Sequence, residues 1–204
     1  MSIRDFWNAQ VVAFGGTGDI TNRNDFEDTL PAAITAKFAA MNGGALTAGS
    51  GVSAAEHNKS NVTLDGGLYT TRIVLDLTGL ASSTTDLDII GNPAGAANAH
   101  IGQITAAVSG AIIGGRVTCL ELPAGGVTDI DLYSATVGTG AQDGGIAALV
   151  ETALITAGGA WTNGATKGLI AVPAADEYLY LVGGAAGTAG TYTAGKFLIE
   201  LFGV

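Results

Sequence analysis

Thr71-Arg72-Ile73-Val74-Leu75-Asp76-Leu77 is the stretch that decides the fold class of this chain. In an extended backbone Ile73, Leu75 and Leu77 fall on one face, whereas Arg72 and Asp76 fall on the other. Alternation with a period of two residues predicts a half-buried β-strand. The stretch Asp129–Tyr133 repeats the alternation and predicts a second half-buried strand.

Short apolar runs separated by Gly, Pro and Asn continue along the rest of the chain and predict further strands. These are 86–90, 100–108, 115–122, 168–172, 177–182 and 196–202. The runs 177–182 and 196–202 are apolar on both faces, so we expect a doubly covered sheet or a subunit interface there. The stretch 145–157 has apolar residues at helical spacing and predicts one inserted helix, with Asp143 as its N-cap.

The chain divides near residue 60. Residues 1–60 predict an N-terminal arm with a short amphipathic helix at 31–41 and a linker of Gly, Ala and Ser. Residues 61–204 predict one domain. Many short strands without a βαβ rhythm favour an all-β fold, an antiparallel β-sandwich of jelly-roll type.

Composition narrows the range of partners. The 204 residues are 48% hydrophobic but only 13% charged, about half the usual charged fraction, and the formal net charge is −10. The eight basic residues are scattered singly, which argues against nucleic acid as a partner. No run is long and apolar enough to span a membrane, no signal peptide is evident and the single cysteine excludes an intrachain disulfide. We therefore expect a subunit that hides much of its surface against copies of itself or a larger assembly.

Two glycine-rich stretches resemble nucleotide-binding loops. Gly190–Lys196 fits the first seven positions of a phosphate-binding loop, but Phe197 follows in place of Ser or Thr. Val137–Asp143 fits part of a dinucleotide fingerprint, but Asp143 replaces the third glycine. We interpret both stretches as turns, the first with Lys196 at the rim of a strand.

Candidate catalytic residues do not form a recognisable set. His57, His100 and Cys119 have no local catalytic pattern, and we interpret Cys119 as a small core residue. The pairs Asp86/Asp88 and Asp129/Asp131 each share one strand face, which suits a solvated face or a contact between subunits to Arg72 or Arg116 better than an acid/base pair.

Two binding alternatives stay open at this point. Asp86, Asp88 and the turn Gly91-Asn92 offer a weak calcium site. Trp161 with Asn163 and exposed tyrosines offers a sugar-binding face, although we prefer Trp161 as a packing residue. We expect no catalytic, cofactor-binding or metal-binding residues.

The Gly/Ala/Thr-rich strands and turns, the low charge, the short arm and the ending Gly190–Leu201 resemble a known class of proteins. They are similar to virion structural proteins of tailed bacteriophages, particularly small head-decoration or accessory capsid proteins of marine phages. The resemblance covers roughly residues 62–204 and carries over no catalytic residue. It implies a sandwich fold, self-association, often as trimers, and attachment to the capsid lattice.

The function expected from the sequence is therefore a non-enzymatic virion structural protein, a capsid decoration or cement subunit assembled in the host cytoplasm. Its expected partners are copies of itself and the major capsid protein or other virion proteins, with no nucleic acid and no membrane. The alternative is a carbohydrate-binding or receptor-binding jelly-roll module of a phage tail or head fibre.

Overall fold

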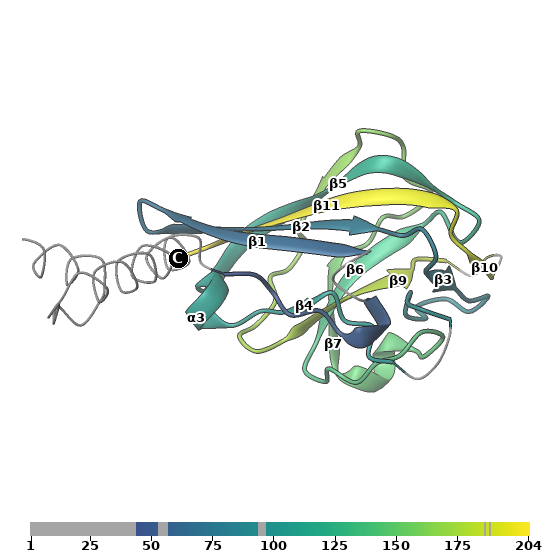
Figure 1. Ribbon diagram of the computed structural model, residues 1–204, viewed down its shortest axis with the longest axis horizontal. Helices are drawn as coiled ribbons and strands as arrows, with labels where there is room; N and C mark the ends of the chain where they lie inside the picture. Colours follow the sequence, from purple (N-terminus) through teal and green to yellow (C-terminus); the bar gives the residue numbers. More distant parts are fainter. Residues whose placement is uncertain (1–43, 53–56, 94–96, 186, 188) are drawn as a thin grey trace, which may run out of the picture. The chain divides into compact units, whose positions relative to one another are not determined.

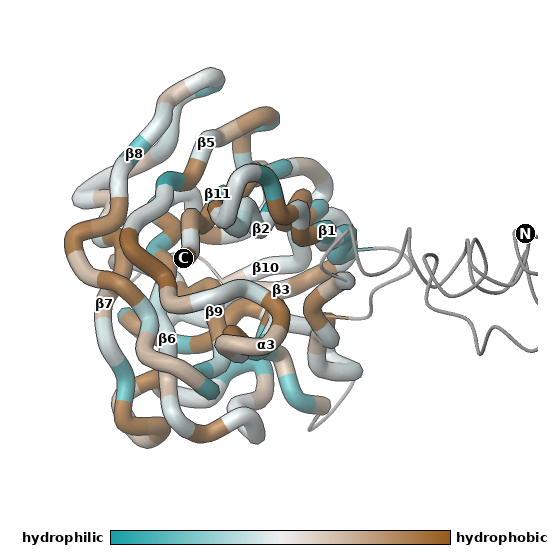
Figure 2. Tube along the Cα trace, turned by 90° about the vertical axis from the view of Figure 1, so that its left-hand side faces the viewer, coloured by the Kyte–Doolittle hydropathy of each residue, from teal (hydrophilic) through white to brown (hydrophobic). Residues whose placement is uncertain are grey.

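The computed structural model describes residues 44–52, 57–93, 97–185, 187 and 189–204, and these form two antiparallel sheets stacked as layers (Figures 1 and 2). The five-stranded sheet contains, in spatial order, β1 (Asn58–Asp65), β2 (Leu68–Asp76), β11 (Ala194–Gly203), β5 (Ile112–Ala124) and β8 (Thr166–Gly168). The four-stranded sheet contains β4 (Gly102–Gln103), β9 (Tyr178–Gly183), β6 (Ile130–Ala135) and β7 (Glu151–Ile155). The predicted all-β antiparallel sandwich is confirmed, whereas its jelly-roll type stays a prediction.

Smaller elements close the ends of the two layers. A two-stranded ribbon pairs β3 (Ala81–Ser82) with β10 (Gly190–Thr191). Short helical turns are η1 (Ser50–Val52), α3 (Ala106–Ser109) and η2 (Ile146–Leu149). No helix in the described part of the chain is long and apolar enough to span a membrane.

Strands β2 and β11 bury one face each, as the alternation in β2 predicts. Ile73, Leu75 and Leu77 are at most 1% exposed, whereas Arg72 and Val74 lie exposed on the other side. In β11, Phe197, Ile199 and Leu201 are buried in the same core, and the Phe197 ring meets Trp161 edge to face. Burial of these side chains between the layers supplies the main hydrophobic stabilisation of this sheet.

Strands β6 and β9 are covered on both sides, which corrects the half-buried prediction for 129–133. Every residue of β6 is buried, and β9 is buried from Leu179 to Gly183. One side of these strands faces the other sheet (Figure 1). The loop 137–149 packs on the other side. The predicted double cover of 177–182 is thus confirmed within one chain, whereas β11 is covered on one side only.

The glycines of the loop 137–149 allow its backbone to approach β9 closely. A Cβ atom at Gly138 would lie 2.6 Å from Cε1 of Tyr178. A Cβ atom at Gly140 would lie 2.6 Å from Cδ1 of Ile89 and 3.1 Å from Cε1 of Tyr180. Glycine at these positions therefore permits a close-packed cover over the aromatic rings.

The predicted helix at 145–157 is wrong. After the single turn η2, Val150 has a φ of 57° and ends the helical path, and the chain continues as β7. Strand β7 pairs with β6, and Leu154 and Ile155 are buried there. Asp143 also has a positive φ, of 66°, and is not the N-cap, which is Gly145. Sheet pairing has outweighed the helical spacing of the apolar residues.

Three predicted strands differ from the structure. Residues 86–90 form isolated bridges, of which Ile89 to Val182 joins the edge of β9. The stretch 100–108 contains only the short β4 and then α3, a helix of four residues. The stretch 168–172 begins where β8 ends. Hydrogen bonds to neighbouring segments, not local propensity, set these boundaries.

The described compact unit runs from Ala45 to Val204 and includes residues that the sequence assigned to the linker. Gly49 N donates to His100 O at 2.8 Å, and Gly51 N donates to Asn98 O at 2.7 Å. Strand β1 begins at Asn58, whose side chain donates to the carbonyl of Ile101. The predicted helix at 31–41 lies outside the described residues.

Candidate functional site

The solvent side of the five-stranded sheet, here called the outer face, carries three parallel rows of side chains set by strand register. The basic row contains Arg72, Glu200 and Arg116. The middle row contains Lys59, Val74, Leu198, Thr118 and Thr166. The acidic row contains Asp76, Lys196 and Glu121.

Glu200 is the centre of the basic row. Its Oε1 lies 3.1 Å from Nε of Arg72, and its Oε2 lies 2.6 Å from Nη2 of Arg116. The Glu200 side chain is 7% exposed, whereas the two arginine side chains are 54% and 52% exposed. Burial opposes ionisation of Glu200, but hydrogen bonds from Arg116 and Arg72 outweigh it and hold the pKa of this carboxyl below its ordinary value. The row therefore has one excess positive charge.

Lys196 is the centre of the acidic row. Its Nζ lies 2.7 Å from Oε2 of Glu121 and 3.3 Å from Oδ2 of Asp76. Hydrogen bonds to Glu121 and Asp76 raise the pKa of Lys196. Desolvation opposes ionisation of Asp76, but hydrogen bonds from Thr78 and Lys196 lower its pKa. The row has one excess negative charge.

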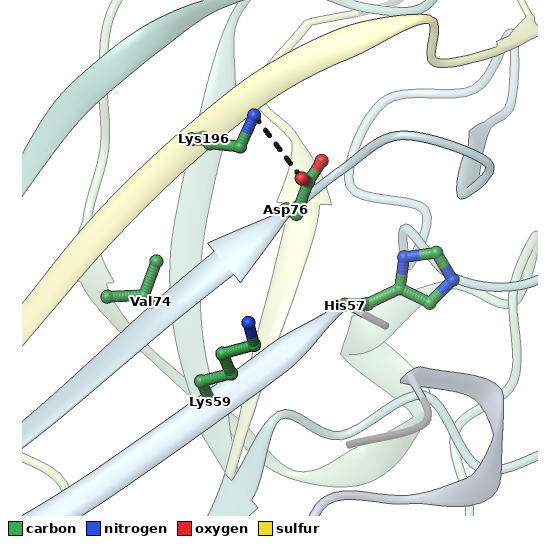
Figure 3. A pocket seen from close by; sticks show the side chains of 5 residues that line it. All are labelled: His57, Lys59, Val74, Asp76 and Lys196. Atoms are coloured by element: carbon green, nitrogen blue, oxygen red, sulfur yellow. Dashed lines mark ion pairs between the residues drawn. The ribbon is translucent and has the colours of Figure 1, made fainter. Parts of the chain in front are cut away.

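A hollow of about 90 Å³ lies at the acidic end of the outer face (Figure 3). It is lined by His57, Lys59, Val74, Asp76 and Lys196, which come from the neighbouring strands β1, β2 and β11 and from the residue before β1. Ligand pockets of proteins usually begin near ~300 Å³, so this hollow is small for an organic ligand.

The centre of the middle row, Val74 and Leu198, is apolar. Val74 is 37% exposed, and Leu198 pairs with it directly and is partly exposed. Beside Leu198, Thr118 Oγ1 lies 2.8 Å from Thr166 Oγ1. Two apolar side chains between two charged rows suit a contact with another protein better than the binding of an ion or a solute.

Charge is distributed unequally between the two sheets. Among the described residues, the outer face carries four of the five basic side chains, Lys59, Arg72, Arg116 and Lys196, and four carboxylates, Asp65, Asp76, Glu121 and Glu200. The other described carboxylates lie on or beside the strands and loops of the four-stranded sheet: Asp86, Asp88, Asp129, Asp131, Asp143, Glu151, Asp176 and Glu177. The described charges of the outer face therefore balance, whereas the strands and loops of the four-stranded sheet carry an excess of carboxylates, of which Asp88, Asp131 and Glu177 are buried.

Within one chain Glu200 binds Arg72 and Arg116, so the subunit contact of Asp86/Asp88 or Asp129/Asp131 with these arginines stays a prediction. Asp88 Oδ2 accepts from Ser83 Oγ at 2.5 Å, and Asp131 Oδ1 accepts from Ala157 N at 2.5 Å. Within the described ranges no three His, Cys, Asp or Glu side chains are placed to hold a metal ion. The sequence reasoning missed Glu200 since it treated 196–202 as apolar on both faces.

Asp131 is an ionisable group inside the protein, 4% exposed. Burial raises its pKa, the hydrogen bond from Ala157 N acts against that, and the charges of Asp129 and Asp86 raise it further. Asp129 Oδ1 is itself buried without a hydrogen-bond partner among the described residues. The two carboxylates thus repel each other beside β6.

The catalytic candidates occupy separate structural positions. His100 is 9% exposed, its ring centroid lies 4.9 Å from that of Tyr178, and burial lowers its pKa. Cys119 is fully buried in β5, which confirms it as a core residue, and burial raises the pKa of its thiol. His57 lies at the hollow on the outer face.

The two glycine-rich stretches form strand ends and loops, not nucleotide-binding loops. Gly190–Lys196 contains β10, the connection Tyr192-Thr193 and the first residues of β11, so it leads into a strand as interpreted from the sequence. Val137–Asp143 is the close-packed loop over β9, and no helix long enough for a dinucleotide site follows it.

The aromatic residues proposed for sugar binding are mostly interior. Trp161 is 5% exposed, and its Nε1 donates to Ile130 O at 2.8 Å, which confirms it as a packing residue. Tyr133, Tyr180 and Tyr192 are buried as well. The expectation that these side chains form an exposed face is wrong, because the rings are buried in the core or, like that of Tyr180, beneath the loop 137–149.

No protein-family model, no curated protein and no solved structure matches this chain. The outer face is therefore the feature of the described structure that bears on function.

Proposed function

We propose that this protein is a non-enzymatic structural subunit of a bacteriophage virion, a capsid decoration or cement protein. In this role it binds the major capsid protein or another virion protein and associates with its own copies. The proposal places it in the virion after assembly in the host cytoplasm.

The outer face is the observation that carries the proposal. A chain with a net charge of −10 presents one open sheet face on which described charges balance and apolar side chains lie between them. Depletion of unpaired charge beside exposed apolar residues is typical of protein–protein contacts. A structural subunit needs such an extended surface, whereas an enzyme needs a concave site that gathers reactive groups.

The buried tryptophan and tyrosines give the sugar-binding alternative little support, since stacking on a sugar needs an exposed ring. Trp161 and Tyr180 are occupied by hydrogen bonds to Ile130 O and Val137 O. The capsid role is therefore the function that the described surface supports best.

Purified particles of the phage that encodes the chain provide the test. Peptide mass spectrometry should find the chain enriched in the particles together with the major capsid protein, relative to the infected-cell lysate. Immunogold labelling should then mark the heads. A chain that stays in the lysate would overturn the proposal, and label confined to tail tips would favour the receptor-binding alternative.

A further inference from the structure

The geometry points to a second copy of this chain as the partner of the outer face, in a face-to-face pair related by a two-fold axis along the middle row. This inference rests on the proposed function only for its premise that copies associate. It specifies a pair, not the trimer that the phage resemblance implies.

The register of the strands sets up the argument. In β2 and β11 the basic row and the acidic row lie two residues on either side of the middle row. Two residues of a strand span about 7 Å, so the rows are equally displaced from Val74 and Leu198. In β5, Arg116 and Glu121 lie on the two sides of Thr118, with a register irregularity near Glu121.

We place a two-fold axis between the two copies, parallel to the middle row. Each strand then faces the same strand of the other copy, which runs in the opposite direction. Arg72 of one copy then faces Asp76 of the other, Glu200 faces Lys196, and Arg116 faces Glu121. All three pairings join opposite charges, and the symmetry repeats each of them once. An isologous contact requires such self-complementarity.

The charges also exclude a face-to-face pair whose two-fold axis runs along β11. Such an axis would place Arg72 of one copy opposite Arg116 of the other, Glu200 opposite the second Glu200, and Asp76 opposite Glu121. Every one of these pairings joins like charges. Like charges repel, so the charge pattern favours the axis along the middle row over the axis along β11, although both axes bring the same two sheet faces together.

The size of the contact is that of a weak pair. Only residues on both sides of the axis overlap, and β2 ends two residues beyond Val74, while β8 has three residues. The four longer strands at about 4.8 Å spacing and about five residues of length give roughly 300 Å² per copy, or about 600 Å² in total, below the ~1,200 Å² of stable interfaces. Stacked sheets rotate by about 30°, so the match is best over the central strands. Those strands, β2, β11 and β5, carry all three charged pairings. Val74 and Leu198 supply the apolar contact on the axis.

Arg72→Glu and Asp76→Arg are the decisive variants, measured by sedimentation velocity on the full chain. Each variant alone places like charges opposite each other twice per pair, so its dimer dissociation constant should rise roughly 30-fold. Mixed in equal amounts, the two variants should form a heterodimer, since the glutamate at position 72 of one faces the arginine at position 76 of the other. Native mass spectrometry would identify that heterodimer.

Glu151→Arg on β7, at the edge of the other sheet, is the matched control for Asp76→Arg. It makes the same change of charge and should keep the dissociation constant of the natural chain. Circular dichroism would establish that each variant is folded.

Several results would overturn the inference. The natural chain could sediment as a monomer up to about 1 mM, or as a trimer. Arg72→Glu could form a tighter dimer than the natural chain, or the mixture of Arg72→Glu and Asp76→Arg could form no dimer. Each of these results contradicts the proposed pair. A monomer overturns it whether another segment or another protein covers the face. Absence from virions would end the proposed function but leave this result standing, because the sedimentation experiment needs no particle.

Discussion

The two sheets bury their strands in different ways, although the sequences of β9 and β11 look alike. In β9 both sides are covered within one chain, by the other sheet and by the loop 137–149. In β11 one side is buried and the other carries Glu200, Lys196 and Leu198. An apolar run therefore does not by itself indicate an interface; a partly exposed row between paired charges is the more specific indication.

The largest difference between the sheets should appear when Val182→Asp and Leu198→Asp are compared by the free energy of unfolding that each variant loses. Val182 is fully buried in β9, so an aspartate there should cost at least about 4 kcal/mol and unfold much of the protein. At Leu198 the aspartate reaches solvent, and the expected loss is below about 1 kcal/mol. Urea unfolding followed by circular dichroism would measure both. Equal losses would show that the outer face is interior.

Glu200→Gln should have the next largest effect. A neutral amide cannot bind two arginines as a carboxylate does, so the expected loss at pH 7 is about 1 to 2 kcal/mol. Because the folded pKa of Glu200 lies below its ordinary value of 4.5, the ion stabilises the fold above that pH. This stabilisation is lost as the pH falls through the folded pKa. The free energies of unfolding of Glu200→Gln and of the natural chain, measured from pH 7 to pH 3, should therefore converge. At pH 7 the control Glu151→Gln should unfold like the natural chain, because Glu151 makes no ion pair with a described residue.

Asp131→Asn should have a smaller effect of opposite sign. The folded pKa of Asp131 is raised, so the folded state takes up a proton before the unfolded state does, and the ion costs stability at neutral pH. Asparagine keeps an oxygen to accept from Ala157 N. The variant should be more stable than the natural chain at pH 7, with the difference vanishing below the ordinary pKa of 3.8. A less stable variant at pH 7 would contradict this account.

Lys59→Gln should give the smallest effect. Lys59 lies on the middle row at edge strand β1, so in the proposed pair it faces its own copy. Removing this like-charge pairing should tighten the dimer about two-fold at low salt. Sedimentation at two salt concentrations would measure it, and weaker pairing would mean that Lys59 contributes attraction.

The fold could be predicted from the sequence where alternation was strict. Thr71–Leu77 gave the correct buried face because Arg72 and Asp76 need water or a partner. The stretch 145–157 failed because Ile146, Leu149 and Leu154 fit a helical period, while a positive φ at Val150 and pairing with β6 require a strand. Local spacing does not contain that information.

The candidate site was harder to predict than the fold. Glu200, Arg72 and Arg116 are far apart in sequence and meet only through the pairing of β2, β11 and β5. Strict alternation in β11 predicts that Glu200 and Phe197 lie on opposite faces of the strand. The identity of its partners follows from register, which the sequence does not specify.

In the proposed pair, the placement of charge bears on how far assembly can proceed. The two-fold contact covers the outer face of both copies, whereas the carboxylates of Asp86, Asp143 and Asp176 stay exposed in loops beside the four-stranded sheet. Like charges on two such pairs oppose the stacking of one pair on another. The unequal placement of charge therefore favours a closed pair over a fibre.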